Sequence, residues 1–339
     1  MTGTTAVDPG ASVTPIEEHI PGRSRWWVLM IAVLLALVMP LGRFIGPYNY
    51  VLQVATVTFM WIALASSWNI LGGYTGYISL GHNVFFGAGG YVAGLLLLKL
   101  GWSPFLTAPL AGLFAMLLGL VAGLITYRTQ GPSFIISTIA LLLVVTLLMD
   151  NWSFVGGSNG LSLPLPGFDI SWLKVPFYYA MLVACIGAVI LGHRVQHSKF
   201  GLALRAIASD EVKAEMAGID TRKYKVMAFA LSAFFPGVVG AIWGYSLSYL
   251  RPVIFLLIAV AARMVLMTII GGRGTVAGPV IGAILVVLLD ESSVTLLGGS
   301  ELNIVIAGVL LVAALLFFPM GIIGTLRERN RLPSWLDWD

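Results

Sequence analysis

The feature that most restricts the fold of this chain is a series of long apolar runs separated by short polar segments. Several runs approach the roughly 20 residues that an α-helix needs to cross the hydrocarbon core of a bilayer. Only 10% of the residues are charged, against about 25% in a soluble domain. We therefore predict an all-α, polytopic integral membrane protein with about ten transmembrane helices. The runs cover residues 26–45, 48–71, 77–98, 104–127, 133–149, 176–192, 225–249, 254–270, 275–289 and 302–320.

The basic residues are unequally shared between the two sides of such a bundle. With a cytoplasmic N-terminus, fourteen Lys and Arg residues fall inside and four outside, namely Arg43, Lys99, Lys174 and Arg251. Cytoplasmic loops carry the excess of positive charge in membrane proteins, so both termini are predicted to be cytoplasmic. The same bias accounts for the net charge of +4. No basic cluster is interleaved with aromatic residues, which argues against nucleic-acid binding.

This topology predicts one membrane domain over residues 26–320. Residues 1–25 are polar and rich in Pro, Gly and Thr, so we expect a disordered cytoplasmic tail. Residues 321–339 form a second cytoplasmic tail. The two longest loops are an outer loop at 150–175 and a cytoplasmic loop at 193–225.

The stretch GYTGYISLGHNVFFGAGGY at 73–91 places six glycines and several polar residues between apolar runs. We predict a broken or re-entrant helix near 73–91, with Ser79, His82 and Asn83 inside the bundle, because irregular backbone is tolerated at membrane depth only within protein. Either a polar lining for a solute or simple helix packing fits these residues.

Glycines recur at four-residue spacing, which lets helices approach closely. The segments 70–81 and 269–282 both begin with Ile-x-Gly-Gly. They indicate a parallel internal repeat or a chance similarity in a glycine-rich chain. The glycines assigned to helix packing are Gly81, Gly87, Gly90, Gly94, Gly271, Gly272, Gly278 and Gly282.

The cytoplasmic loop predicts one short amphipathic helix that starts after Ser198. Ala208, Val212 and Met216 form an apolar stripe at four-residue spacing, and Gly218 is placed to end the helix. Such a stripe suits either the inner leaflet of the membrane or a groove in a cytosolic subunit.

Three segments of the chain carry a family resemblance. In chain order, these are the stretch at 73–91, SKFGLALRAIASDEVKAEMAGI at 198–219 and LMTIIGGRGTVAGPVIGA at 266–283. They resemble segments that occur in the same order in the permease subunits of branched-chain amino acid ABC importers (the LivM type). The resemblance covers roughly residues 50 to 325. It implies the coupling of solute import to ATP hydrolysis on separate subunits.

The resemblance also implies partners and an interface. The expected partners are a second related permease, two cytosolic ATP-binding subunits that hold ATP and Mg²⁺, and a periplasmic or lipid-anchored binding protein. This chain itself is expected to bind no cofactor and no metal. The loop helix would seat in a cleft of the ATP-binding subunit through Arg205, Ala206, Ile207, Asp210, Glu211, Ala214, Glu215, Gly218 and Ile219.

One residue departs from the family pattern. Arg263 stands where family members usually carry a glutamate before the Gly-Gly motif. A charged residue in a membrane helix is costly and tends to be paired or functional. Three roles stay open: binding a substrate carboxylate, pairing with a companion permease, or reaching out to the membrane surface.

Two other classes of protein are disfavoured by missing groups. An ion-coupled secondary transporter needs a carboxylate near mid-membrane, and the acidic residues, including Asp290, are predicted to lie at helix ends, in loops or in tails. An intramembrane enzyme needs a nucleophile and base or several metal ligands, but His82 is the one histidine in an apolar run. The chain also lacks a phosphate-binding loop motif.

The predicted solute is a branched-chain amino acid, with urea, short amides and aromatic acids as alternatives. A path for such solutes needs a few polar groups between apolar walls. The candidate groups are Ser79, His82, Asn83, Ser137, Thr138 and Arg263. For the serines and the threonine, hydrogen bonding between helices is the competing interpretation.

Overall fold

The structure is a computed structural model of the chain, and it describes residues 48–167, 172–297 and 321–328 with a few isolated positions. Most of the predicted helices at 26–45 and 302–320 lies outside the described residues. The elements are α2 (Tyr48–Gly72), α3 (Asn83–Leu100), α4 (Pro104–Thr126), α5 (Pro132–Asn151), η2 (Ser153–Val155), η3 (Gly157–Asn159), β1 (Leu161–Ser162), α6 (Lys174–Gln196), α7 (Lys199–Ser209), α8 (Glu211–Met216), α9 (Thr221–Leu247), β2 (Tyr249–Leu250), α10 (Pro252–Phe255), α11 (Ile258–Gly272), α12 (Ala277–Leu297) and α14 (Gly321–Glu328).

Eight helical stretches of the described chain are long and apolar enough to cross a membrane. They correspond to the eight predicted runs that fall within the described residues. The prediction of an all-α, multi-pass membrane protein is therefore confirmed.

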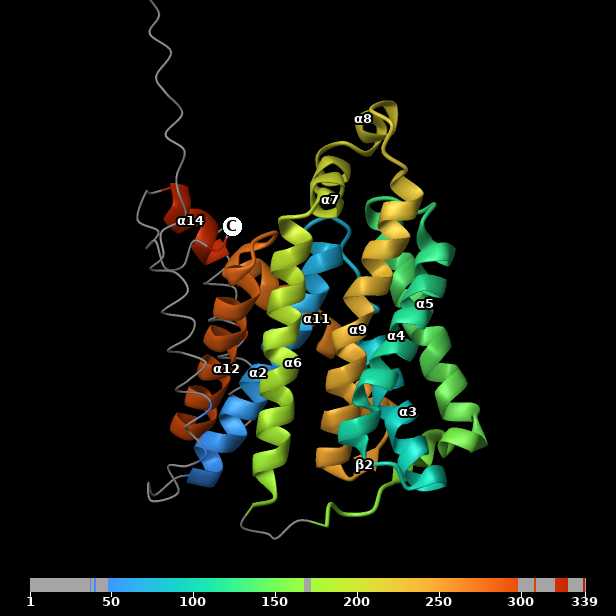
Figure 1. Cartoon of the computed structure of the whole chain (residues 1–339), viewed down its shortest axis with the longest axis vertical. Helices are drawn as coiled ribbons and strands as arrows, with labels where there is room; N and C mark the ends of the chain where they lie inside the picture. Colours follow the sequence, from blue (N-terminus) through green and yellow to red (C-terminus); the bar gives the residue numbers. More distant parts are fainter. Residues whose placement is uncertain are drawn as a thin grey trace, which may run out of the picture.

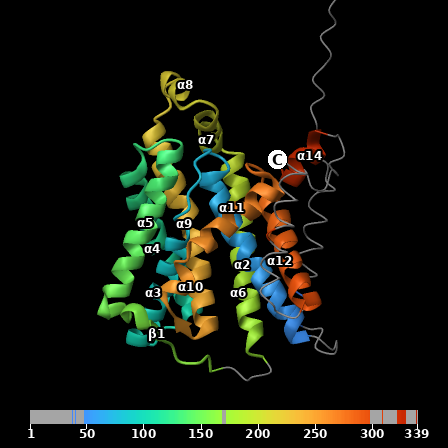
Figure 2. The same ribbon diagram turned by 180° about the vertical axis from the view of Figure 1, so that it is seen from behind.

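The long helices run side by side, so the bundle has two ends (Figure 1). We call the end with α7, α8 and α14 the inner end, following the predicted orientation, and the opposite end the outer end. At the outer end β1 and β2 pair antiparallel, with Leu161 opposite Leu250. Figure 2 shows the same arrangement from behind.

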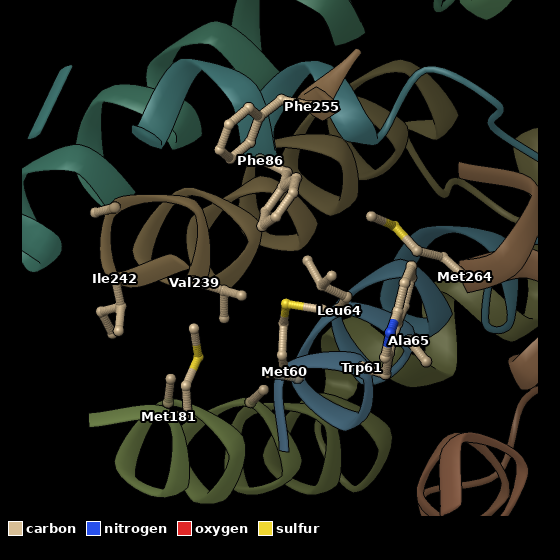
Figure 3. Close-up of a cluster of buried hydrophobic side chains, with 14 of the residues drawn as sticks. Met60, Trp61, Leu64, Ala65, Phe86, Met181, Val239, Ile242, Phe255 and Met264 are labelled. Atoms are coloured by element: carbon tan, nitrogen blue, oxygen red, sulfur yellow. The ribbon is translucent and has the colours of Figure 1, made fainter. Parts of the chain in front are cut away.

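The buried core lies around α2. Met60 and Leu64 of α2 face Met181 of α6, Val239 of α9 and Met264 of α11 (Figure 3). In contrast, α5 is mostly exposed, because only 17% of its most apolar window is buried. A helix that is apolar on its exposed faces suits contact with lipid or another membrane chain.

Two pairs of neighbouring helices touch through glycine. A Cβ atom on Gly240 of α9 would lie 1.9 Å from the Phe86 carbonyl oxygen of α3. A Cβ on Gly282 of α12 would lie 1.8 Å from the Met267 carbonyl oxygen of α11. Both distances are far below van der Waals contact, so only glycine allows these backbones to approach so closely.

Two apolar runs are less regular than their hydropathy predicts. Helix α3 begins at Asn83 and not at residue 77, and residues 73–82 are not helical. The run 254–270 is interrupted at residues 256–257, between α10 and α11. The two breaks meet, because the Asn83 side-chain amide donates to the Leu257 carbonyl at 3.0 Å. The same carbonyl accepts from the Val260 N–H of α11 at 2.9 Å, so the Asn83 amide adds a second hydrogen bond at the start of this helix.

Candidate functional sites at the helix break and the inner loop

Residues 73–82, which we call the entry segment, join α2 to α3. Figure 2 shows this segment running from the inner end of α2 down beside α9. Ser79, His82 and Asn83 at its end have no exposed surface. The prediction that they lie inside the bundle is confirmed. Because α3 continues from Asn83 to the outer end, the chain here is a broken crossing and not a re-entrant loop.

The two side chains at the break each have one free polar atom. His82 Nε2 lies 2.8 Å from the Ser232 hydroxyl of α9, and its ring stacks on Phe229 at 5.4 Å between centroids. Its Nδ1 atom and the Asn83 Oδ1 atom are buried without a partner among the described residues. A buried polar atom without a partner is costly, so these two atoms are suited to bind a polar solute or water.

Thr138 of α5 belongs to the same buried cluster. Its hydroxyl accepts a hydrogen bond from the Leu80 backbone N–H at 3.1 Å, which fixes the entry segment against α5. Ser137 does not join the cluster, because it is half exposed and bonds the Ser133 carbonyl of its own helix at 2.8 Å. Sequence reasoning missed Ser232, although it is a polar residue within an apolar run.

Arg263 does not reach this cluster. Its guanidinium pairs with the Asp290 carboxylate of α12 and lies over the Trp61 ring at 5.2 Å. Asp290 was predicted at an outer helix end, and this placement is wrong, since α12 continues to Leu297. The pair is partly exposed on the bundle surface. None of the three predicted roles of Arg263 included a partner within the same chain.

A carboxylate inside a membrane-length helix weakens the earlier argument against ion-coupled transport. However, Asp290 is already paired with a guanidinium. A coupling ion at this carboxylate would have to displace Arg263 from the salt bridge.

The inner loop forms two helices and not the single predicted one. The chain breaks at Asp210, whose side chain accepts from the Lys213 backbone N–H at 3.1 Å and so begins α8. Hydrogen bonds to this carboxylate from the Lys213 backbone N–H and ammonium group hold the pKa of Asp210 below its usual range. Gly218 has a left-handed φ of 86° and ends the loop helix as predicted.

The residues predicted to contact an ATP-binding subunit divide into two groups. Ile207 and Ala214 are buried within this chain, and Glu211 is bound to Lys225 at 2.6 Å. Glu215 accepts from the Thr221 hydroxyl at 2.5 Å but stays exposed. The other six members, Arg205, Ala206, Asp210, Glu215, Gly218 and Ile219, all have exposed or half-exposed surface.

The predicted apolar stripe is also divided by the break at Asp210. Val212 and Met216 lie on α8, with 63% and 84% of their surface exposed, while Ala208 belongs to α7. A groove of about 440 Å³ is lined by the α7–α8 junction, the entry segment and the start of α5.

The two Ile-x-Gly-Gly segments contact each other at the inner end. The Asn69 side chain binds the Gly274 N–H at 3.0 Å and the Thr275 carbonyl at 2.8 Å. Arg273 Nε donates to the Gly72 carbonyl at 2.8 Å. The ends of the parallel helices α2 and α11 are thereby tied together.

Comparison with known proteins identifies the family. The sequence profile of the family described as "Branched-chain amino acid transport system / permease component" matches residues 50–315, which is most of the chain. The chain belongs to this permease family. It is thus a membrane permease of the kind found in ABC transporters, which is not a class of enzyme.

Individual relatives are distant and differ in their named solutes. The branched-chain amino acid permease LivM of Escherichia coli is 25% identical, over 83% of this chain and 72% of the relative. A probable branched-chain permease LivH of Methanocaldococcus jannaschii is 26% identical, over 70% of this chain and 79% of the relative. The ribose permease RbsC of Haemophilus influenzae is 26% identical, over 56% of this chain and 60% of the relative. No solved structure gives a significant match.

Proposed function

We propose that this chain is the membrane-spanning subunit of an ATP-driven importer of branched-chain amino acids in a bacterial inner membrane. Two cytosolic subunits would bind ATP and Mg²⁺, a second related permease would complete the membrane part, and a periplasmic or lipid-anchored protein would deliver the solute. Both chain termini would lie in the cytoplasm.

The observation that carries this proposal is the exposed surface of the α7–α8 loop. The loop projects beyond the long helices at the inner end (Figure 1). Leu202, Val212 and Met216 are 64%, 63% and 84% exposed, although each is apolar. Docking into a cleft of a cytosolic subunit would bury them, and a fully buried side chain of this size contributes about 1.5–3 kcal/mol.

The cluster at the helix break supports a solute that carries an ammonium group. The Ser232 hydroxyl donates to the Phe229 carbonyl and so accepts from His82 Nε2, which leaves His82 Nδ1 as an acceptor. Asn83 Oδ1 and His82 Nδ1 are thus two buried acceptors without partners in the described chain, and the ammonium group of an amino acid can donate to them. Apolar side chains, including Phe85 and Phe229, surround the histidine. A leucine or valine side chain suits such apolar walls, as solute sites combine few polar groups with apolar surface.

A solute screen tests the substrate. We expect leucine, isoleucine and valine to raise the melting temperature of the cognate solute-binding protein, and urea, acetamide, benzoate and ribose to leave it unchanged. In proteoliposomes, the complete complex should then take up labelled leucine only when ATP is present on the side of the membrane that carries the ATP-binding subunits. If urea or ribose alone raised this melting temperature, the proposed substrate would be wrong.

A deletion tests the coupling loop. Removal of residues 205–218 should abolish leucine uptake while the remaining helices still insert and purify. If the deleted complex retained ATP hydrolysis stimulated by the loaded binding protein, the loop would not be the coupling element. An unchanged permease–ATPase complex after the deletion would favour the inner leaflet of the membrane as the surface that the loop contacts.

A further inference from the structure

The entry segment lies close to α7 and contacts α8 of the inner loop. A Cβ atom on Gly76 would lie 3.6 Å from the Ala208 Cβ of α7. The Tyr77 hydroxyl donates to the Glu211 carboxylate at the start of α8. The non-helical segment between α2 and α3 is therefore in direct contact with the part of the chain that is exposed at the inner end.

Glu211 also holds a buried lysine of a membrane helix. Lys225 of α9 lies 2.6 Å from Glu211 Oε1, and the two side chains are only 7% and 13% exposed. The same ammonium lies 3.5 Å from the Tyr77 hydroxyl and 4.7 Å from the centre of its ring. Tyr77, Glu211 and Lys225, which we call the inner triad, thus bind one another from three separate elements.

Aromatic rings continue from this triad to the helix break. Tyr77 contacts Phe134 at 5.0 Å between ring centroids, and Phe134 contacts Phe229 at 6.1 Å. Phe229 stacks on His82 at 5.4 Å. A continuous row of packed side chains therefore leads from α8 to His82, the residue before Asn83.

We propose that the inner triad joins α8 to the entry segment, so that a displacement of α8 moves His82 and Asn83. This inference rests on the proposed function, in which α8 follows the ATP-binding subunit. Tyr77 and Lys225 are positioning residues in this account, since they touch neither nucleotide nor solute.

The contacts within the triad are costly to break, so the entry segment moves together with α8. Separating Glu211 from Lys225 would leave two uncompensated charges where little water reaches them, which is strongly unfavourable. The aromatic row below the triad is close-packed, and packed interiors transmit displacement because they compress very little. If the same ion pair were exposed, water would solvate the separated charges, and the pair would hold α8 and α9 together only weakly.

The test removes one hydroxyl and leaves the fold intact. Tyr77→Phe keeps the ring against Phe134 but loses the bond to Glu211. In the complete complex in proteoliposomes, we expect ATP hydrolysis to stay near the wild-type rate and labelled leucine uptake to fall by about fivefold or more. Tyr127→Phe, a cytoplasmic-end tyrosine outside the triad, is the control and should change neither. Equal uptake by the two variants would overturn the proposal.

A second readout is independent of the solute. Hydrogen exchange of residues 79–86 is compared in the complex with and without ATP plus vanadate. We expect ATP to alter exchange there in the wild type and not in Tyr77→Phe, with photolabelling by azido-ATP equal in both. An unaltered response in Tyr77→Phe would overturn the link. A wild-type complex that takes up no leucine but shows the Tyr77-dependent response supports the link and overturns the proposed substrate.

Discussion

At the scale of single residues, the polar side chains of this chain serve different purposes according to depth and partner. His82 and Asn83 are fully buried, and each keeps one polar atom without a partner in the described chain. Arg263 and Asp290 neutralise each other on the bundle surface. The first pair is therefore suited to a ligand, and the second pair to stability or assembly.

Replacing Asn83 should separate solute handling from folding. Asn83→Ala removes both the free Oδ1 atom and the bond to the Leu257 carbonyl, whereas Asn83→Asp retains an oxygen at the free position. We expect Asn83→Ala to reduce leucine uptake by about tenfold, equivalent to ~1.4 kcal/mol. Uptake is measured in proteoliposomes, with Ser137→Ala as the control. Wild-type uptake by both Asn83→Ala and His82→Ala would assign this cluster to packing alone.

Replacing Arg263 should show how much one unpaired charge destabilises the helix bundle. Arg263→Met leaves Asp290 unpaired, so we expect the melting temperature in detergent to fall, by an amount equivalent to about 1–3 kcal/mol for a partly exposed pair. The double variant Arg263→Met with Asp290→Met should recover part of this loss. If the double variant loses as much as the sum of the two single variants, the ion pair contributes no coupling energy.

At the scale of elements, the sequence predicts the long helices and the break near 73–91, but not the breaks at residues 256–257 and at Asp210. An apolar run indicates burial in lipid or protein, but it does not distinguish a helix from buried extended chain, so the apolar run starts at residue 77 whereas α3 starts at Asn83. The loop was predicted to form one helix because Ala208, Val212 and Met216 share one face at four-residue spacing. The Asp210 side chain instead accepts from the Lys213 N–H, and hydrophobic periodicity does not record such a local side-chain bond.

Contacts between segments far apart in the chain could not be predicted from the sequence. The partner of Arg263 is 27 residues away on another helix, and the inner triad joins residues from three elements. Such pairings depend on helix rotation and register, which hydropathy leaves open. The glycine spacing predicted close packing but not which helices would meet.

The α3–α9 contact gives a prediction for an element. Gly240→Ala places a methyl group on the Phe86 carbonyl oxygen, so the helices must separate. We expect a loss of about 1–3 kcal/mol in the free energy of unfolding, measured by thermal denaturation in detergent. Leu117→Ala on the exposed face of α4, where Leu117 is 61% exposed, should cost far less. A loss in Gly240→Ala no larger than that of Leu117→Ala would contradict this packing.

At the scale of the whole molecule, the two candidate sites lie at different depths of one bundle. The α7–α8 loop projects at the inner end (Figure 1), and the helix break lies within the buried core. Chemical energy released at a cytosolic subunit would enter through the loop and act on the break through the inner triad. A permease driven in this way needs no ionisable carrier group of its own along the solute path.

The central claim is that α8 docks on the ATP-binding subunit, and site-specific photo-cross-linking tests it most directly. A photoreactive amino acid replaces Met216 on α8 or, as the control, Leu117 on the exposed face of α4. In intact membranes we predict that the probe at 216 cross-links to the ATP-binding chain and the probe at 117 does not. Cross-linking of the probe at 216 to lipid alone, with none to that chain, would contradict the account.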